Sequence, residues 1–219
     1  MPHLDRLTDF IFANTSVDAP PHVPELVLHL ADEAHDLWLK TEEELEALGL
    51  PPPFWAFAWA GGQGLARYVL DHPETVRDRD VVDFASGSGL VAIAAAKAGA
   101  ARVTALDIDR FAGAAIAMNA ERNGVRVDMR IADAVGEDIA CDVFLAGDVF
   151  YDRPFAERLT PWFDRLAERG TRVIVGDPGR AYLPRARVEE LARYAVPVTR
   201  ALEDAEVKAT TVWQWRPVG

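Results

Sequence analysis

Short apolar segments alternate with helical patterns through the middle of this chain of 219 residues, and this alternation constrains the fold more than any other feature. Five apolar segments have the length of strands: Asp80–Phe84, Arg102–Leu106, Arg126–Ala132, Asp142–Gly147 and Thr171–Gly176. Apolar residues at helical spacing separate them, near Leu90–Ala98, Phe111–Arg122 and Phe155–Arg169. Strands that are connected through helices run parallel, so the pattern predicts a parallel sheet covered by helices on both faces.

The last part of the chain departs from this alternation. Pro184–Tyr194 has the spacing of a helix, and two strand-like segments follow it, Pro197–Leu202 and Val207–Trp215. A connection this short joins antiparallel strands. The predicted fold class is therefore α/β, with a Rossmann-like sheet of seven strands that is mostly parallel and ends in an antiparallel C-terminal hairpin.

The first 50 residues predict an extension of this domain. Residues 1–24 contain four prolines, which favours an irregular arm. Glu25–Leu48 has apolar residues at helical spacing and is followed by Gly49, a typical helix C-cap. We therefore expect an N-terminal arm and helical extension over residues 1–50 and one main domain over residues 51–219, whose first helix lies near Gly64–Leu70.

Composition excludes several classes of protein. Lys and Arg total 23 against 35 Asp and Glu, and a net charge of −12 has the wrong sign for a surface that binds nucleic acid. Cys141 is the only cysteine, so no intrachain disulfide can form, and the five histidines match no metal-binding spacing and are expected at the surface or as caps. No apolar run is long enough to span a membrane, and the N-terminus resembles no targeting peptide. We expect a cytoplasmic monomer without a metal, a nucleic acid or a membrane partner.

An aspartate lies at or within one residue of the end of each predicted parallel strand. These residues are Asp83, Asp107, Asp133, Asp148 and Asp177. Open α/β sheets bind their ligands at the carboxyl ends of the strands, so the row predicts a ligand site there. The alternative is structural, because aspartates also begin turns and cap helices. That alternative explains one such residue better than five.

The loop after the first predicted strand favours a nucleoside cofactor. Gly87 and Gly89 allow a ligand to approach the backbone, and the following helix N-terminus offers free N–H donors. The same glycines with Asp107 also fit a dinucleotide fingerprint. Asp83, four residues before Gly87, would repel a pyrophosphate but suits a ligand that carries an ammonium and a sulfonium. We therefore favour S-adenosylmethionine over a dinucleotide.

Several motifs resemble those of known methyltransferases. The run Val81-Val82-Asp83-Phe84-Ala85-Ser86-Gly87-Ser88-Gly89 with Asp107 resembles motifs I and II of the class I methyltransferases, although Ala85 stands where many members have a glycine. Asp148-Val149-Phe150-Tyr151 resembles the Asp-x-x-Tyr motif of the seven-strand lysine methyltransferases. Pro53–Phe57, Trp59–Gln63, Asp148–Asp152 and Gly176–Pro184 are similar to segments of the electron transfer flavoprotein beta-subunit lysine methyltransferases. This resemblance covers nearly the whole chain, from about Phe10 to Trp215.

The resemblance implies a cofactor site for S-adenosylmethionine, with S-adenosylhomocysteine as the product. The implied contacts are Trp59 and Gly61 at one wall, Gly87 and Gly89 at the methionine end, Asp107 at the ribose, Asp133 and Ala134 at the adenine, and Gly147 beneath the sulfonium. Asp83 joins this set from its place in the loop. Trp59 has an alternative role as an ordinary core aromatic, and a core position is favoured for Phe54, Trp55 and Phe57.

The same resemblance places the catalytic residues after the fourth predicted strand. A free lysine is protonated at neutral pH, and deprotonating it costs roughly 4.6 kcal/mol at pH 7. A nearby carboxylate stabilises the ammonium, so Asp148 is expected to attract and orient the lysine and to relay the proton, while Tyr151 directs the amine. Arg180 and Tyr182 are candidates for gripping the substrate, unless Asp177–Arg180 is only a Pro-Gly turn.

The resemblance implies transfer of methyl groups to lysines of the electron transfer flavoprotein beta subunit. The acidic charge of the chain fits a basic protein segment but names no particular protein. Three alternatives remain open: a methyltransferase for another basic protein, such as a ribosomal protein, or for a small amine; an NAD-binding oxidoreductase; and a non-catalytic module that binds cofactor and partner.

Overall fold

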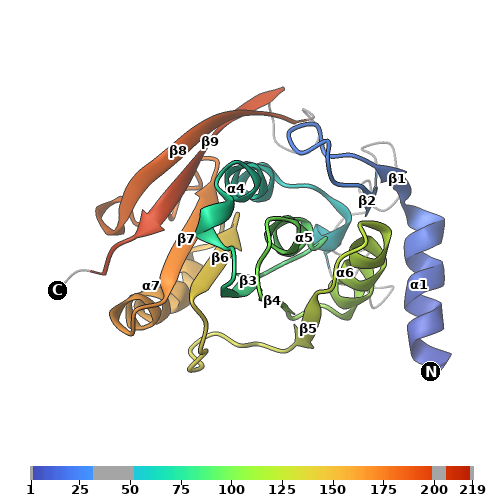
Figure 1. The fold of residues 1–219 in the computed structure, drawn as a ribbon, viewed down its shortest axis with the longest axis horizontal. Coiled ribbons are helices and arrows are strands. Elements are labelled where there is room, and N and C mark those ends of the chain that lie inside the picture. Colours follow the sequence, from blue (N-terminus) through green and yellow to red (C-terminus); the bar gives the residue numbers. More distant parts are fainter. Residues whose placement is uncertain (1, 32–51, 199–205, 218–219) are drawn as a thin grey trace.

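The computed structural model describes residues 2–31, 52–198 and 206–217, and a seven-stranded sheet lies at its centre (Figure 1). The strands are β3 (Asp80–Phe84), β4 (Arg102–Asp107), β5 (Asp128–Ile131), β6 (Val143–Gly147), β7 (Arg172–Asp177), β8 (Val188–Pro197) and β9 (Val207–Trp215). Their order is β5-β4-β3-β6-β7-β9-β8, in which β9 pairs antiparallel with both β7 and β8 and the other pairs are parallel. The predicted fold class is confirmed. The chain reverses its direction of winding between β3 and β6, where open α/β sheets form a ligand-binding crevice.

Helices cover both faces of the sheet (Figure 1). One face carries α4 (Ala60–Asp71), α5 (Leu90–Lys97) and α6 (Arg110–Arg122), and the other carries α7 (Arg153–Glu168). Strand β3 shows why both faces are buried: Val81 packs in the core beneath α4 and α5, whereas Val82 and Phe84 pack in an aromatic core beside α7. Side chains of a strand alternate between faces, so a run of apolar residues fills both cores.

The predicted parallel strands and the helices between them agree with the structure to within three residues at each end. β3 and β9 have the predicted bounds. The first helix of the main domain is longer than expected, since α4 begins at Ala60 rather than near Gly64. Three short 3-10 helices were not predicted: η1 (Phe54–Ala56), η2 (Pro73–Thr75) and η3 (Arg185–Arg187).

The predicted helix at Pro184–Tyr194 is wrong, because residues 188–197 form strand β8. A β-bulge between Glu190 and Ala192 shifts the pairing register with β9. The bulge changes which face the following side chains occupy, so the apolar residues lose the two-residue alternation of a strand and mimic helical spacing. The hairpin itself is present, but its first strand precedes Pro197 rather than following it, and residues 199–205 lie outside the described part of the chain.

The N-terminal residues also differ from prediction. In place of an irregular arm, residues 2–14 form helix α1 (Pro2–Asn14), and a small antiparallel pair follows, made of β1 (Ser16–Asp18) and β2 (Leu28–Leu30). The helix expected over Glu25–Leu48 is therefore wrong for its first residues, and residues 32–48 lie outside the described residues. The extended segment is held by α6, whose Asn119 and Asn123 side-chain oxygens accept hydrogen bonds from the backbone N–H groups of His29 and Val27. His29, expected at the surface, is buried.

The N-terminal segment shares its packing with the sheet domain. Ile11 of α1 is fully buried beside Trp55 and Ala115, and Leu26 and Leu28 belong to the core beneath α4 and α5. A division of the chain at residue 50 therefore stays a proposal about sequence organisation. Figure 1 shows α1 lying against α6 at the edge of the molecule.

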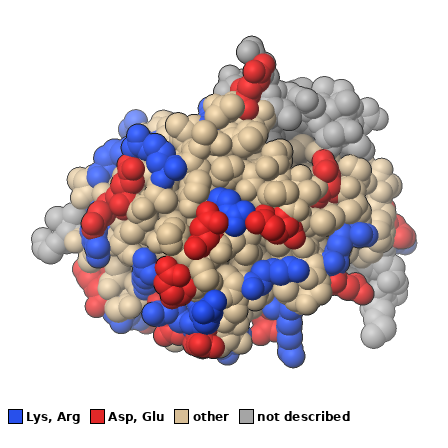
Figure 2. All heavy atoms as spheres, turned by 45° about the horizontal axis from the view of Figure 1, so that its top comes forward, with Lys and Arg blue, Asp and Glu red and all other residues tan. Residues whose placement is uncertain are grey.

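On the face drawn in Figure 2, basic and acidic side chains are interspersed rather than gathered into one patch. Arg67 of α4 forms ion pairs with Glu25 and with Asp71. Within the described parts of the chain, no helix has the length and apolarity needed to cross a membrane.

Helix α4 begins directly on the carboxyl ends of β6 and β7, and glycines allow this approach. A Cβ added at Gly61 would lie 2.4 Å from the Gly176 carbonyl oxygen and 2.5 Å from Oδ2 of Asp148. A Cβ at Gly147 would lie 2.9 Å from the Cα of Gly62. These distances are too short for any side chain, so the start of α4 and the two strand ends depend on having none.

We therefore expect Gly61→Ala to destabilise the protein, by about 2 kcal/mol or more, since backbone must move to admit the methyl group. Gly62→Ala is the matched control: a Cβ there would meet nothing closer than a Leu90 methyl at 4.0 Å, and alanine favours a helix by up to about 1 kcal/mol over glycine. Urea unfolding of the two variants measures the difference. Equal stability of the two would contradict the close contact.

Candidate active site

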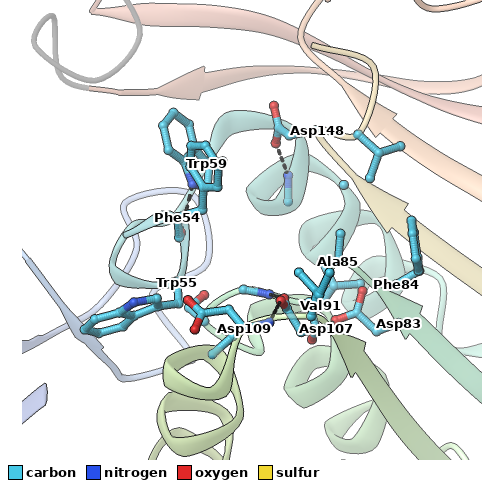
Figure 3. Close-up of a pocket in the computed structure, with 18 of the residues that line it drawn as sticks. Phe54, Trp55, Trp59, Asp83, Phe84, Ala85, Val91, Asp107, Asp109 and Asp148 are labelled. Carbon is cyan, nitrogen blue, oxygen red and sulfur yellow. Dashed lines mark hydrogen bonds between the residues drawn. The ribbon is translucent and has the colours of Figure 1, made fainter. Parts of the chain in front are cut away.

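A cavity of about 490 Å³ lies at the carboxyl ends of β3, β4 and β6. Figure 3 shows Asp83, Asp107 and Asp109 on one side of it and Asp148 with Trp59 on the other. Most of the residues predicted from the sequence line this cavity: Trp59, Asp83, Gly87, Asp107, Asp133, Ala134, Gly147, Asp148, Tyr151 and Arg180. Three predicted residues do not line it, namely Gly61, Gly89 and Tyr182. Gly61 lies in the close contact between α4 and the strand ends.

The loop from β3 to α5 folds back toward β4. Gly87 has a φ of 54° and its N–H donates to Oδ2 of Asp107 at 2.8 Å. Gly89, at φ 82°, is the N-cap of α5, and a Cβ there would lie 3.1 Å from Ile116, so its role is close packing of α5 against α6. Ala85 adopts a φ of 53°, a conformation that favours glycine, which explains why related loops carry a glycine at this position.

Asp83 is the most deeply buried carboxylate of the cavity. Its Oδ2 accepts hydrogen bonds from the Ser86 hydroxyl and from the Ala92 N–H at 3.0 Å. Burial raises the pKa of Asp83 to about 7 despite these bonds. A carboxylate removed from water in this way gains from a cation that reaches it.

Asp109 was not singled out from the sequence, although it also lines the cavity. It caps α6 by accepting the Phe111 N–H at 2.8 Å, and burial raises its pKa to about 6. In the sequence, Asp109 stands two residues after Asp107 and directly before a helical pattern, which is typical of a helix N-cap. A cap is the commonest role of such a residue, so the sequence alone does not separate it from others.

The adenine end expected from the sequence is more exposed. Asp133 pairs with Arg158 of α7 at 2.7 Å, and this pairing lowers the pKa of Asp133. Ala134 is buried in the aromatic core beside α7. Arg158, which also lines the cavity, thus orients Asp133, and the two charges neutralise each other.

The aromatic residues before α4 form one wall of the cavity. Phe54, Trp55 and Phe57 were expected in the core, and Trp55 is indeed buried, stacked against Phe111 of α6. All three nevertheless line the cavity, and Phe54 is 49% exposed. The Trp59 indole N–H donates to the Phe54 carbonyl at 3.0 Å, as Figure 3 shows. The sequence signal for this wall was a group of four aromatic residues in a segment that begins with three prolines.

Asp148 is the most constrained residue on the opposite side. It has a φ of 58°, and its N–H donates to the Gly176 carbonyl at 2.9 Å. Its Oδ2 accepts the Gly62 N–H at the start of α4, at 2.9 Å, and its Oδ1 accepts Nε and Nη2 of Arg180 at 3.1 and 2.7 Å. A helix N-terminus and a guanidinium together favour the ionised carboxylate.

Tyr151 lies at the outer rim of the cavity, where it is 52% exposed. Its ring lies 5.9 Å from that of Phe54. Burial, followed by the charges of Asp152 and Asp107, raises the pKa of Tyr151. It therefore presents a neutral phenol at the entrance of the cavity.

The two residues expected to grip the substrate lie in different places. Arg180 turns inward to Asp148, because Oδ1 of Asp177 accepts the N–H groups of Gly179 and Arg180 at 2.7 and 2.8 Å and shapes the turn. Tyr182 lies outside the cavity, with the guanidinium of Arg153 5.5 Å from its ring centre. Of the five aspartates in the row, Asp177 is the one that shapes this turn rather than lining the cavity.

In the parts of the chain that the structure describes, no group of three or more His, Cys, Asp and Glu side chains has the arrangement of a metal site. The lone cysteine, Cys141, is half-buried, and burial raises the pKa of its thiol to about 11. The chemistry of the cavity therefore depends on its carboxylates, the paired arginines and the aromatic wall.

Comparison with known proteins agrees with this geometry. A family model described as ribosomal protein L11 methyltransferase (PrmA) matches residues 67–149. The structure of a ribosomal protein L11 methylase from Lactobacillus delbrueckii subsp. bulgaricus shares the fold, with a TM-score of 0.54 and 21% identity over 73% of this chain and 81% of that one.

Two relatives match over nearly the whole chain. An electron transfer flavoprotein beta subunit lysine methyltransferase of Xenopus laevis is 36% identical over 215 residues, which cover 95% of this chain and 86% of that protein. A homologue of this enzyme in Caenorhabditis elegans is 35% identical over 91% of this chain and 86% of that protein. This identity over nearly the whole chain, together with a cavity built from the strand ends, shows that the chain belongs to the family of electron transfer flavoprotein beta subunit lysine methyltransferases.

Proposed function

We propose that this protein transfers methyl groups from S-adenosylmethionine to lysine side chains of the electron transfer flavoprotein beta subunit. The observation that carries the proposal is the division of the cavity into two chemically different sides. One side holds Asp83, Asp107 and Asp109, and the other holds Asp148 and Trp59. A donor and an acceptor can thus meet between them.

The residues on the first side fit the cofactor. Asp83, buried and with a pKa raised to about 7, suits the ammonium of the methionine part. Asp107 lies at the end of β4, where a carboxylate can accept hydrogen bonds from ribose hydroxyls. Asp133 and Ala134 are proposed at the adenine, and Gly87 and Gly147 offer backbone without side chains. Gly61 and Gly89 would act indirectly, through the packing of α4 and α5.

A diphosphate fits the same cavity poorly. Asp83, Asp107 and Asp109 lie where the glycine loop would hold its negative charge. The arginines that line the cavity, Arg158 and Arg180, are each paired with an aspartate. Among the described residues, the loop side of the cavity therefore presents three carboxylates to a diphosphate, which disfavours the oxidoreductase alternative.

The residues on the second side fit a lysine. When bound, the cofactor supplies a methyl group on a positively charged sulfur. Tyr151 and Phe54 form an aromatic rim along which the apolar stem of a lysine can pack. Asp148 lies at the inner end, where its carboxylate accepts an N–H of the amine and fixes the direction of the nitrogen lone pair. Tyr182, outside the cavity, is proposed to contact the substrate protein rather than the lysine.

The choice of substrate rests on the extent of similarity. The L11 methyltransferase family matches residues 67–149, which build the cofactor side. The flavoprotein methyltransferases also match beyond this region, where Tyr151 and Arg180 lie. A cytoplasmic location and a monomeric state remain proposals from the sequence.

We expect the purified protein, incubated with the flavoprotein and S-adenosylmethionine, to raise the intact mass of the beta subunit in steps of one methyl group. Ribosomal protein L11 and a small amine serve as competing substrates. Preferential labelling of either one would replace the proposed substrate. Binding of both cofactor and flavoprotein without any mass change would indicate a non-catalytic module.

Asp148→Asn should reduce kcat at least about 100-fold, because the amide has one acceptor oxygen in place of two and no charge, so it cannot accept from both the Gly62 N–H and Arg180 as the carboxylate does. The affinity for S-adenosylhomocysteine, measured by calorimetry, should stay within a few-fold of wild type. Asp128→Asn, on the exposed strand β5, is the matched control and should change neither quantity. Equal losses of turnover and cofactor affinity in Asp148→Asn would instead place Asp148 at the cofactor.

The affinity for S-adenosylhomocysteine should rise with pH between about 6 and about 8, by about tenfold, because the ammonium needs the ionised form of Asp83 and its pKa is raised to about 7. At pH 6 Asp83 is mostly protonated, so binding must release its proton. Calorimetry in buffers of different ionisation enthalpy measures this release.

Asp83→Asn should bind the ligand more weakly and with a flatter pH dependence, in which Asp109, titrating near pH 6, remains. The sign for stability is opposite. Ionisation of a carboxyl whose folded-state pKa is raised destabilises the free protein as the pH rises from about 4 to about 7. An affinity for S-adenosylhomocysteine that fell between about pH 6 and about pH 8 would contradict the assignment of Asp83.

A further inference from the structure

The carboxylate proposed to receive the substrate amine already holds a cation of the protein itself. Nε and Nη2 of Arg180 both donate to Oδ1 of Asp148, at 3.1 and 2.7 Å. The side chains are 22% and 11% exposed, so water screens the pair only in part. The Arg180 guanidinium also lies 6.0 Å from the Trp59 ring centre, facing the cavity that both charged residues line.

This pairing bears on the protonation of the substrate. Methyl transfer needs the lysine as a neutral amine, and an unpaired carboxylate in a partly buried site would stabilise the ammonium and raise its pKa by one or more units. The pair of a carboxylate and a guanidinium carries no net charge, so it does not raise the pKa of the ammonium in this way. The guanidinium stays protonated at every pH at which the enzyme works.

We propose that Arg180 neutralises Asp148 so that the site accepts the lysine as a free amine, an inference that rests on the proposed function. A carboxylate has about four lone-pair positions, so Asp148 can accept an amine N–H while it keeps Arg180. The proton of the ammonium passes to solvent at the open rim beside Tyr151, and no proton is transferred to Asp148. Arg180 is a positioning residue that acts through Asp148.

The local fold holds Arg180 in this place. Asp177 accepts its backbone N–H, and Gly179 has a φ of 94°, which allows the chain to turn back toward β6. The Asp177-Pro178-Gly179-Arg180 turn therefore delivers a guanidinium inward instead of exposing it to a substrate protein. This gives the turn a function that the sequence left open.

Other charged groups around Asp148 remain the same when Arg180 is replaced. Tyr151 lies on the same loop as Asp148, after β6. Helix α4 contributes its N-terminus with the Gly62 N–H, and β7 contributes Asp177, whose pKa is raised by burial. Among residues 52–198, the other charged side chains that line the cavity are Asp83, Asp107, Asp109, Asp133 and Arg158. A change in pH profile on replacing Arg180 therefore reports the loss of its own charge.

The test is the pH profile of kcat, from about pH 6.5 to about 9.5, with the flavoprotein and S-adenosylmethionine at saturation, since kcat reports groups in the bound complex. Arg180→Gln removes the charge and keeps a hydrogen-bond donor. Its rising limb should move to higher pH by about one unit, with kcat about tenfold lower near pH 7 and converging on wild type at high pH. The KM near pH 7 should not rise, because Asp148 holds the ammonium more strongly once the charge of Arg180 is gone. Arg180→Lys, which keeps a positive charge, should retain most of the wild-type profile.

Arg185→Ala is the matched control. Arg185 lies in the same segment, 5.3 Å from the Trp213 ring and away from the cavity, and its loss should leave the limb in place. A uniform loss of kcat at all pH values in Arg180→Gln would show a structural role, and a uniform gain would show that Arg180 blocks the lysine site. The proposal would also be overturned if the rising limb of the kcat profile moved as far in Arg180→Lys as in Arg180→Gln. Failure of the wild-type enzyme to methylate the flavoprotein would refute the proposed function instead, a result separable from all of these.

Discussion

The contact between the first turn of α4 and the carboxyl ends of β6 and β7 sets the geometry on which the site depends. Gly61 and Gly176 meet backbone to backbone, at a separation that no side chain would permit. This approach brings the Gly62 N–H within 2.9 Å of the Asp148 carboxylate. The position of Asp148 is thus determined by the packing of a helix on a sheet edge, and the strained φ of Asp148 is maintained because both its backbone and its side chain are bonded to that edge.

Two carboxylates of the cavity show how the same chemical group takes different roles in different surroundings. Asp83 is buried with only a hydroxyl and one backbone N–H on its Oδ2, so its pKa rises and its full charge develops best when a cation arrives. Asp148 already has a guanidinium and a helix N-terminus, which favour its ionised form, and the pair that it makes with Arg180 offers a hydrogen-bond acceptor without net charge. A cationic donor and a neutral acceptor are the two species that a methyl transfer to an amine must bring together. The opposed environments separate these tasks along one cavity.

The parallel half of the fold was predictable because β3, β4, β6 and β7 are short apolar runs whose length and neighbouring helices are typical of a parallel sheet. The row of aspartates also located the cavity, since carboxyl ends of parallel strands share one edge. Prediction failed where tertiary contacts override local pattern. The bulge in β8 gave its apolar residues a helical spacing, and β2 is held extended by Asn119 and Asn123, whose partners are remote in sequence. The direction of the Arg180 side chain likewise depends on a turn and on Asp148, thirty-two residues away, and no sequence pattern reports it.

Similarity to the L11 methyltransferase family is confined to one part of the chain, and this part holds most of the cofactor side of the cavity. The segment shared with the L11 methyltransferase family ends at residue 149, after the cofactor side and Asp148 but before Tyr151. Tyr151 and Arg180, together with the β8–β9 hairpin, lie beyond it. The acceptor carboxylate therefore lies within the shared part, whereas the groups that set its charge and frame its entrance lie outside. Under the role proposed for Arg180, changing the residue paired with the carboxylate changes the protonation state that the site favours without disturbing the strands beneath the cofactor side.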